Sequence, residues 1–190
     1  MEYNHFITFI ERYGYISEED KKNLKVFSTL KKVKKKEILI EKGTPCNKIF
    51  FVKKGLLRAY YTDGNGREIT RMFAWQNRFL TNICSFSNFE ASNETIECIK
   101  DAEILSINKM DFDRLIKSSE NFNKIYSVIL EKCAALHLKR FEVLSSFDIQ
   151  QKMLYLKNEY PFLRKELSDT LLASFLGISR EYYVKHKHLL

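Results

Sequence analysis

SDTLLASFLGISREYYVK, residues 168–185, is the most specific stretch of this 190-residue chain. Apolar side chains recur at helical spacing on both sides of one glycine, at Leu172, Leu176, Ile178 and Tyr183. Ala173 is small where a second helix would cross the first, and Gly177 lies where a left-handed backbone is needed, which glycine adopts at low cost. The pattern predicts a helix-turn-helix, two short helices joined by a tight turn.

The residues after this turn are candidates for contact with a nucleic acid. Ser179 is expected to cap the second helix, because a serine oxygen accepts hydrogen bonds from backbone amides there. Arg180 and Glu181 then occupy the first turn, whose side chains reach base edges when such a helix enters a DNA major groove. The alternative is an ordinary helical hairpin, and His186 departs from the pattern because an apolar residue is more usual there.

A long helix is predicted before this segment, over residues 123–146. Its apolar stripe repeats every three or four residues, at Tyr126, Ile129, Cys133, Leu136, Arg140, Val143 and Phe147. Such a stripe either packs on its own domain or forms a dimer seam, and both can hold for different parts of it. Asp148 is expected to cap a further helix over residues 149–158, which Pro161 ends, and residues 163–166 are expected to form a link.

Residues 38–107 have the composition of β-strands. The expected strands are short and end at glycine-rich turns: 49–52, a turn at 53–55, 56–62, a hairpin turn at 63–66, 68–74, 95–99 and 103–107. Many short strands joined in this way predict a barrel or a sandwich. Helices are expected near the N-terminus over residues 3–13 and after Ser17, and again over residues 110–116.

Charge and cysteine content narrow the class of protein. The net charge of +8 suits a polyanionic partner, and the lysine run at residues 31–36 is interpreted as a solvated strand and turn rather than a nucleic-acid patch. The cysteines are too widely spaced for a zinc or iron–sulfur site, which predicts reduced thiols: Cys46, Cys84, Cys98 and Cys133. The N-terminus resembles no signal segment and no apolar run approaches the roughly 18 residues of a membrane span, so we expect a cytoplasmic protein that does not enter a membrane.

The predicted order of β-roll, long helix, short helix and helix-turn-helix resembles the cyclic-AMP receptor protein/FNR family of bacterial regulators. Residues 177–181 are similar to the start of that family's recognition helix, and the turns at 53–55 and 63–68 are similar to turns of its β-roll. The resemblance implies an α+β fold. It comprises an N-terminal β-roll (double-stranded β-helix) sensor domain at residues 1–122, a dimerisation helix at 123–147 and a small helix-turn-helix domain at 148–190.

The resemblance also implies a homodimeric, DNA-binding transcription regulator and three groups of residues. DNA contacts are expected from Ser179, Arg180, Glu181, Tyr182 and Lys185. A dimer interface is expected at Tyr126, Ile129, Cys133, Leu136, Arg140 and Val143. A pocket for a small-molecule effector, between the β-roll and the long helix, is expected at Phe79, Leu80, Asn82, Ile83 and His137.

The sequence departs from the family pattern at the sensor and at the C-terminus. Members that bind cyclic AMP carry a Gly-Glu pair where this chain has Thr81-Asn82, and residues 79–99 contain neither arginine nor lysine. A phosphate needs a cation or a nest of N–H groups, so we expect no cyclic-AMP binding and no cofactor. Leu190 falls at the end of the recognition helix, so we expect most of the family's β-hairpin wing to be lacking.

Two other classes of function compete with a regulator. One is a stand-alone ligand-binding or protein-interaction module whose helical tail only packs, but such a tail has little reason to carry the pattern of residues 177–185. The other is a small β-barrel enzyme with a histidine-rich metal site. No histidine occurs between His5 and His137, so we expect neither a metal site nor catalysis.

Overall fold

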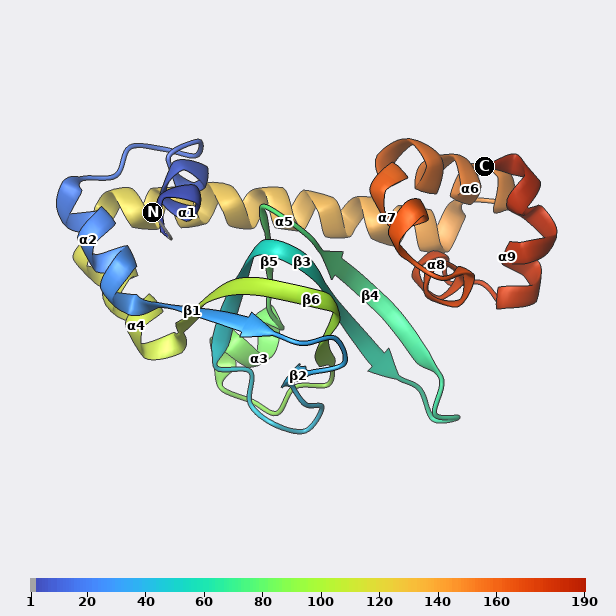
Figure 1. Ribbon diagram of the computed structural model, residues 1–190, viewed down its shortest axis with the longest axis horizontal. Coiled ribbons are helices and arrows are strands. Elements are labelled where there is room, and N and C mark those ends of the chain that lie inside the picture. Colours follow the sequence, from blue (N-terminus) through green and yellow to red (C-terminus); the bar gives the residue numbers. More distant parts are fainter. Residues whose placement is uncertain (1–2) are drawn as a thin grey trace. The chain divides into compact units, whose positions relative to one another are not determined.

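The computed structural model describes residues 3–190, which form two compact units (Figure 1). The first unit comprises the chain up to Tyr61 together with Met72–Leu130, and the second comprises Thr62–Arg71 together with Glu131–Leu190. The chain passes from one unit to the other inside two strands, after Tyr61 and after Arg71, and inside a long helix, after Leu130, so these three elements belong to both units.

The first unit is built on antiparallel strands. They are β1 (Ser28–Val33), β2 (Ile38–Ile40), β3 (Lys48–Thr62), β4 (Glu68–Ala74), β5 (Arg78–Leu80) and β6 (Thr95–Asn108). The sheet has the order β1-β6-β3-β4, with β2 paired to β6 and β5 paired to β3. Non-consecutive neighbours of this kind are what a β-roll requires, and together with the helices they confirm the expected α+β class.

Two details of the strand prediction are wrong. Residues 53–55 are not a turn, because β3 runs through them with a bulge at which the register against β6 shifts. Gly55 makes the bulge possible: its φ is +96°, and a Cβ there would lie 2.5 Å from the Cα of Ala102. The expected strands 95–99 and 103–107 are one continuous strand, β6.

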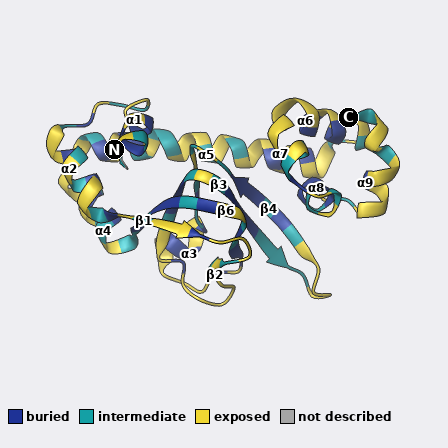
Figure 2. Ribbon diagram, viewed as in Figure 1, coloured by how far each residue is buried: buried dark blue, intermediate teal, exposed yellow. Residues whose placement is uncertain are grey.

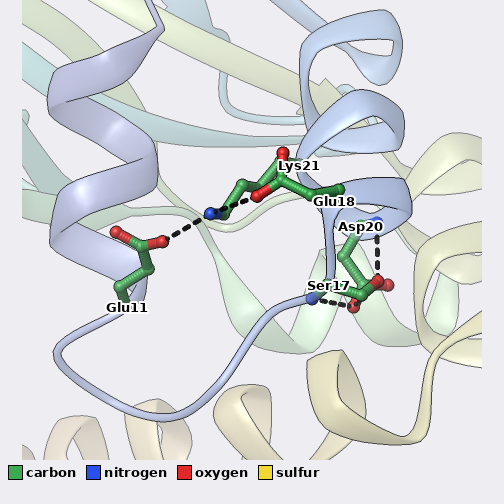
Figure 3. A network of polar contacts seen from close by, with 5 residues as sticks. All are labelled: Glu11, Ser17, Glu18, Asp20 and Lys21. Atoms are coloured by element: carbon green, nitrogen blue, oxygen red, sulfur yellow. Dashed lines mark hydrogen bonds and ion pairs between the residues drawn. The ribbon is translucent and has the colours of Figure 1, made fainter.

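Helices cover the strands of the first unit. They are α1 (Asn4–Ile10), α2 (Glu18–Phe27), α3 (Ile83–Asn88), α4 (Lys109–Ser118) and the first part of α5 (Glu120–Ser146). Ser17 caps α2 as expected, in a reciprocal capping box with Asp20 (Figure 3). Beside it, Lys21 lies 3.0 Å from a carboxylate oxygen of Glu11 and 2.8 Å from one of Glu18.

Aromatic side chains dominate the core of this unit. The Phe51 ring lies 4.8 Å from that of Phe6, 5.1 Å from that of Phe9 and 5.1 Å from that of Phe79, measured between centroids. Phe6 and Phe9 both come from α1, so their burial fixes this short helix against the sheet.

The second unit is helical apart from the hairpin segment that it shares with β3 and β4. After the remainder of α5 it contains α6 (Ile149–Glu159), α7 (Pro161–Glu166), α8 (Asp169–Leu176), α9 (Arg180–His186) and a 3₁₀ turn, η1 (Lys187–Leu189). Asp148 caps α6 as expected. The expected link at residues 163–166 is instead part of α7, because proline is well tolerated in the first turn of a helix and here begins one. No helix within residues 3–190 is both long enough and apolar enough to cross a bilayer.

Candidate nucleic-acid interface

The turn between α8 and α9 has the backbone that the sequence predicts. Gly177 has φ +65° and ψ +36°, the left-handed region that glycine tolerates best. The amide of Ile178 donates to the carbonyl of Ala173 at 3.1 Å, which closes the C-terminal end of α8. A Cβ on Gly177 would lie 2.9 Å from Cδ2 of Leu144, so space as well as backbone conformation favours glycine.

Apolar residues hold the two helices together. Leu172, Ala173, Leu176 and Tyr183 are each at most 2% exposed, and Ile178 is half-buried. At the other end of the motif, Lys187 of η1 lies 2.8 Å from a carboxylate oxygen of Asp169 in the first turn of α8. Residues 168–185 therefore form a packed helix-turn-helix, as their spacing predicts.

The first turn of α9 presents charged side chains outward. Ser179 caps the helix by accepting a hydrogen bond from the amide of Tyr182 at 3.1 Å. Arg180, Glu181 and Lys185 are exposed, and Figure 2 shows α9 as largely exposed. The pKa of Glu181 is held below its usual range, first by its own backbone amide and then by the Ser179 hydroxyl, so the carboxylate is ionised at neutral pH.

Tyr182 and His186 form a second pair on this helix. Tyr182 is 44% exposed, and its ring centroid lies 4.4 Å from that of His186. Nδ1 of His186 lies 2.9 Å from the Tyr182 carbonyl oxygen, which explains how a histidine replaces the usual apolar residue at half-buried position 186.

These side chains have the chemistry of direct DNA readout. A guanidinium donates to O6 and N7 of guanine, and a carboxylate accepts from N4 of cytosine. An exposed lysine further along the helix suits a phosphate oxygen.

Arg140 and Val143 do not lie on an open face of α5. They are 4% and 0% exposed and belong to the core of the second unit, so the packing alternative holds for them. The Arg140 guanidinium stacks 3.6 Å from the centroid of the Phe175 ring and donates to the carbonyl oxygen of the same residue. Burial lowers the pKa of Arg140 to about 10, so it still carries its charge at neutral pH.

The other residues of the expected dimer stripe are half-buried: Tyr126, Ile129, Cys133 and Leu136. Tyr126 and Ile129 pack against the core of the first unit. A different face of α5 is open, and in the second unit it carries Leu138 and Phe141, which are 70% and 71% exposed, and Leu144, which is 42% exposed.

The residues expected around an effector have varied environments. Leu80 is 3% exposed, Phe79 belongs to the aromatic core and Ile83 is 38% exposed. Asn82 is buried and caps α3: its amide oxygen accepts from the Ser85 amide, and its Nδ2 donates to Ser92 at 3.0 Å and to Asn93 at 2.9 Å. His137 is an exposed residue of α5 within the second unit.

Arg58 is a buried cation that sequence reasoning missed. It is 3% exposed, its Nη1 lies 3.1 Å from Oε1 of Glu97, and its guanidinium lies 4.4 Å from the Tyr60 ring centroid. The signal is present but weak, since an arginine in an apolar run of β3 (LLRAYY) can be buried only beside a partner from another strand. Glu97 is that partner, directly across from Arg58 in the register of β3 and β6.

No group of three or more histidine, cysteine or acidic residues within residues 3–190 is arranged to hold a metal ion. The four cysteines are free thiols, with Cys46 and Cys98 buried and Cys84 exposed. Burial, followed by the neighbouring carboxylates, raises the pKa of Cys98 to about 11, so this thiol stays protonated at neutral pH.

Comparison with known proteins agrees with this architecture. Residues 30–119 match the family model of the Cyclic nucleotide-binding domain. No curated protein sequence matches the chain. Residues 30–119 are thus similar to cyclic nucleotide-binding domains.

Solved structures extend the likeness to nearly the whole chain. CLP of Xanthomonas campestris, a c-di-GMP-responsive global regulator, matches with a TM-score of 0.74 and 14% identity over 91% of each chain. FixK2 from Bradyrhizobium japonicum matches with a TM-score of 0.71 and 13% identity over 85% of this chain and 83% of its own. A crp/fnr-family protein from Eubacterium rectale matches with a TM-score of 0.70 and 21% identity, over 90% and 81%. The chain has the fold of the Crp/Fnr regulators, and the expected resemblance is confirmed at that level.

Proposed function

We propose that this chain is a homodimeric, DNA-binding transcription regulator and not an enzyme, and that its β-roll does not bind cyclic AMP. The observation that carries the proposal is the outward display of charged side chains on α9, after a capped start and a left-handed Gly177 turn. The buried residues of this motif would also serve an ordinary helical hairpin. The exposed Arg180, Glu181 and Lys185 add the donors and the acceptor that base and phosphate contacts need.

The proposed DNA contacts divide by chemistry. Arg180 and Glu181 lie in the first turn of α9, where base edges would be reached, and Lys185 lies one turn further on. Ser179 and Tyr182 border this turn and suit phosphate or sugar oxygens. The net charge of +8 adds a general attraction to DNA.

A second copy of the chain is the proposed partner of the open face of α5. Within the second unit this face follows the alternating spacing of three and four residues that two packed helices share, at Ala134, His137, Phe141 and Leu144. It lies one residue step, about 100°, around the helix from the buried Arg140. Large exposed apolar side chains gathered on one face suit a protein interface, and a two-fold pair of α9 helices would suit two half-sites.

The interior of the sensor argues against a cyclic nucleotide. The side chains of Asn82, Ser85 and Ser92 form hydrogen bonds with one another and with backbone groups. Arg58, a buried cation of the same unit, already pairs with Glu97. Buried Glu94 adds a further carboxyl group, which would repel a phosphate when ionised. An effector, if the β-roll takes one, would therefore be neutral or largely apolar.

Selection of a duplex from a random library, followed by titration of variants, tests the proposal. Arg180→Ala should weaken binding to the selected operator by about 5- to 150-fold and relax specificity at one base, because a bidentate base contact is worth about 1–3 kcal/mol. Lys185→Ala should weaken binding to all duplexes alike and reduce the salt slope by about one. Lys157→Ala, an exposed lysine of α6, is the matched control and should leave operator affinity unchanged. Equal operator binding by the wild type and Arg180→Ala, or failure to select any duplex, would contradict the proposal.

A further inference from the structure

The second unit contains a buried cation that DNA readout does not use. Arg140 lies on α5, is 4% exposed and forms no ion pair with a carboxylate of residues 3–190. Its Nη1 has no hydrogen-bond acceptor among these residues. Burying a guanidinium without a counter-charge is costly, and an apolar side chain of similar volume would often serve stability as well or better. The segments that accept hydrogen bonds from Arg140 indicate a role for this residue other than stabilising the core.

Three backbone carbonyls accept from Arg140, and they come from two separate segments. One belongs to Phe175, in the last turn of α8, where carbonyls have no partner within the helix. The other two belong to Thr70 and Arg71 of β4, each 3.4 Å from a guanidinium nitrogen. One side chain therefore ties the end of α8, two residues before the Gly177 turn, to a β-strand.

Ser174 makes a second connection between the same two segments. Its Oγ accepts from the Thr70 amide at 2.9 Å and donates to the Glu68 carbonyl at 2.9 Å. The Thr70 hydroxyl lies 3.0 Å from the same oxygen and, since the Ser174 proton is already used, donates to it. Thr70 is 2% exposed, and its two bonds to Ser174 are partly buried, whereas the bond from Ser174 to Glu68 is exposed.

Strand β4 continues from this connection into the other unit. Glu68–Arg71 belong to the second unit, while Met72, Phe73 and Ala74 belong to the first, where they are 6%, 2% and 0% exposed. A strand anchored in the β-roll core at one end and bonded to α8 at the other transmits displacement along its backbone. The chain thus holds a covalent route from the β-roll to the turn before α9.

We propose that Arg140, Ser174 and Thr70 form a latch that sets the turn before α9 according to the position of β4. The part of the inference that concerns DNA rests on the proposed function. The poorly compensated charge of Arg140 fits a contact that must change partners when β4 moves, because a fully satisfied network would favour one arrangement too strongly. An effector in the β-roll would then alter DNA affinity through Thr70 and Arg71.

Amide hydrogen exchange of the free protein tests the latch without DNA. Ser174→Ala should speed exchange of the Ile178 and Tyr182 amides about 5- to 30-fold, the range that corresponds to one or two kcal/mol for the loss of its three hydrogen bonds, two of which are partly buried. The amide of Tyr160, bonded to Leu156 at 3.1 Å within the same unit, should keep its rate. Ser145→Ala, which removes a serine hydroxyl bonded only within α5, is the matched control and should change neither.

Operator binding gives the second readout. Arg140→Lys keeps the positive charge but lacks the several N–H donors of a guanidinium. Both this variant and Ser174→Ala should raise the operator dissociation constant about 5- to 30-fold. Non-specific duplex binding and its salt slope should stay unchanged. The combination of the two substitutions should be less than additive, because both act through one connection.

The outcomes separate the latch from the proposed function. Unchanged exchange at Ile178 and Tyr182 in Ser174→Ala overturns the latch, and so does faster exchange that includes Tyr160, because the serine would then be merely structural. If operator affinity is unaffected in both variants, the latch does not control DNA binding and is overturned. If the wild type binds no duplex, the proposed function fails, and the exchange measurement alone decides the latch.

Discussion

The helices α3 and α9 lie in different units and both begin with a side-chain cap, yet the polar residues that follow differ in burial and in partners. At α3, Asn82 caps the helix and its other amide group bonds to Ser92 and Asn93. Ser85, one turn on, accepts from the Cys46 amide and donates to the Glu90 carbonyl. All these groups are satisfied within the protein, and Asn82 and Ser85 are at most 6% exposed.

At α9, the protein itself uses the cap, buried Tyr183 and the contact between Tyr182 and His186, but not the charged side chains of Arg180 and Lys185. Ser179 accepts from the Tyr182 amide, while Arg180 and Lys185 project outward and form no ion pair within residues 3–190. The comparison teaches that a polar helix start is not in itself a binding site. Burial and internal partners make the polar groups of α3 structural, whereas the exposed charged side chains of α9 are available for the proposed DNA contacts.

The largest effect is expected on the open face of α5, where the proposed dimer would bring two copies of α9 together. Phe141→Glu should raise the dimer dissociation constant at least about 100-fold, because a carboxylate buried in an interface without a partner costs on the order of 3 kcal/mol or more. Sedimentation at several concentrations measures this. Leu154→Glu, a similar change at a 49% exposed leucine of α6, should leave the dimer intact. A monomeric wild type at micromolar concentration would contradict the proposed dimer through α5.

The turn that positions α9 should be sensitive to a single methyl group. Gly177→Ala should destabilise the protein by about 1–3 kcal/mol, because alanine is strained in the left-handed region and its Cβ would lie 2.9 Å from Leu144. Gly64→Ala, where a Cβ meets nothing within 4 Å, should change stability by less than about 0.5 kcal/mol. Thermal unfolding compares the two, and equal midpoints would contradict this account of the turn.

At α3 the expected loss is of stability and not of binding. Asn82→Ala should cost about 1–2 kcal/mol, the usual penalty for losing a cap and leaving buried partners unsatisfied. Asn88→Ala, at an exposed asparagine of the same helix, should cost little. Urea denaturation gives both values. A variant at Asn82 as stable as the wild type would mean that α3 is less fixed than its hydrogen bonds indicate.

The last prediction is that cyclic nucleotides do not bind. Isothermal titration with cyclic AMP or cyclic GMP should give no binding heat at physiological concentrations, because residues 79–99 supply no cation and Arg58 is paired with Glu97. Binding with a low-micromolar dissociation constant that is abolished in Asn82→Ala would contradict this prediction. It would mean that α3, like α9 in the proposal, takes part in binding.

The sequence predicts helix caps and turns correctly where residues close together in the chain determine the backbone conformation. Ser17, Asp148 and Ser179 cap helices as predicted, and Gly177 turns left-handed as predicted. The errors fall where a distant strand intervenes. Gly55 was expected in a turn, but β6 runs alongside and converts it into a bulge within β3.

The candidate site divides in the same way. The helix-turn-helix could be predicted because its spacing, its cap and its glycine are all local. The role of Arg140 could not, because its acceptors lie 70 residues before it, at Thr70, and 35 after it, at Phe175. Nothing in the sequence near Arg140 separates a buried guanidinium from one on an open helix face.

The sequence by itself determined that residues 123–146 form a helix with a stripe of three- and four-residue spacing, and that Ser179 caps α9. Only the tertiary structure decided that the stripe through Arg140 and Val143 is buried and that the face through Phe141 is open. The physical reason is that helical periodicity fixes which side chains share a face, since that depends on the backbone alone. Which face meets the core depends on long-range packing, and two neighbouring apolar faces of one helix differ little until that packing is known.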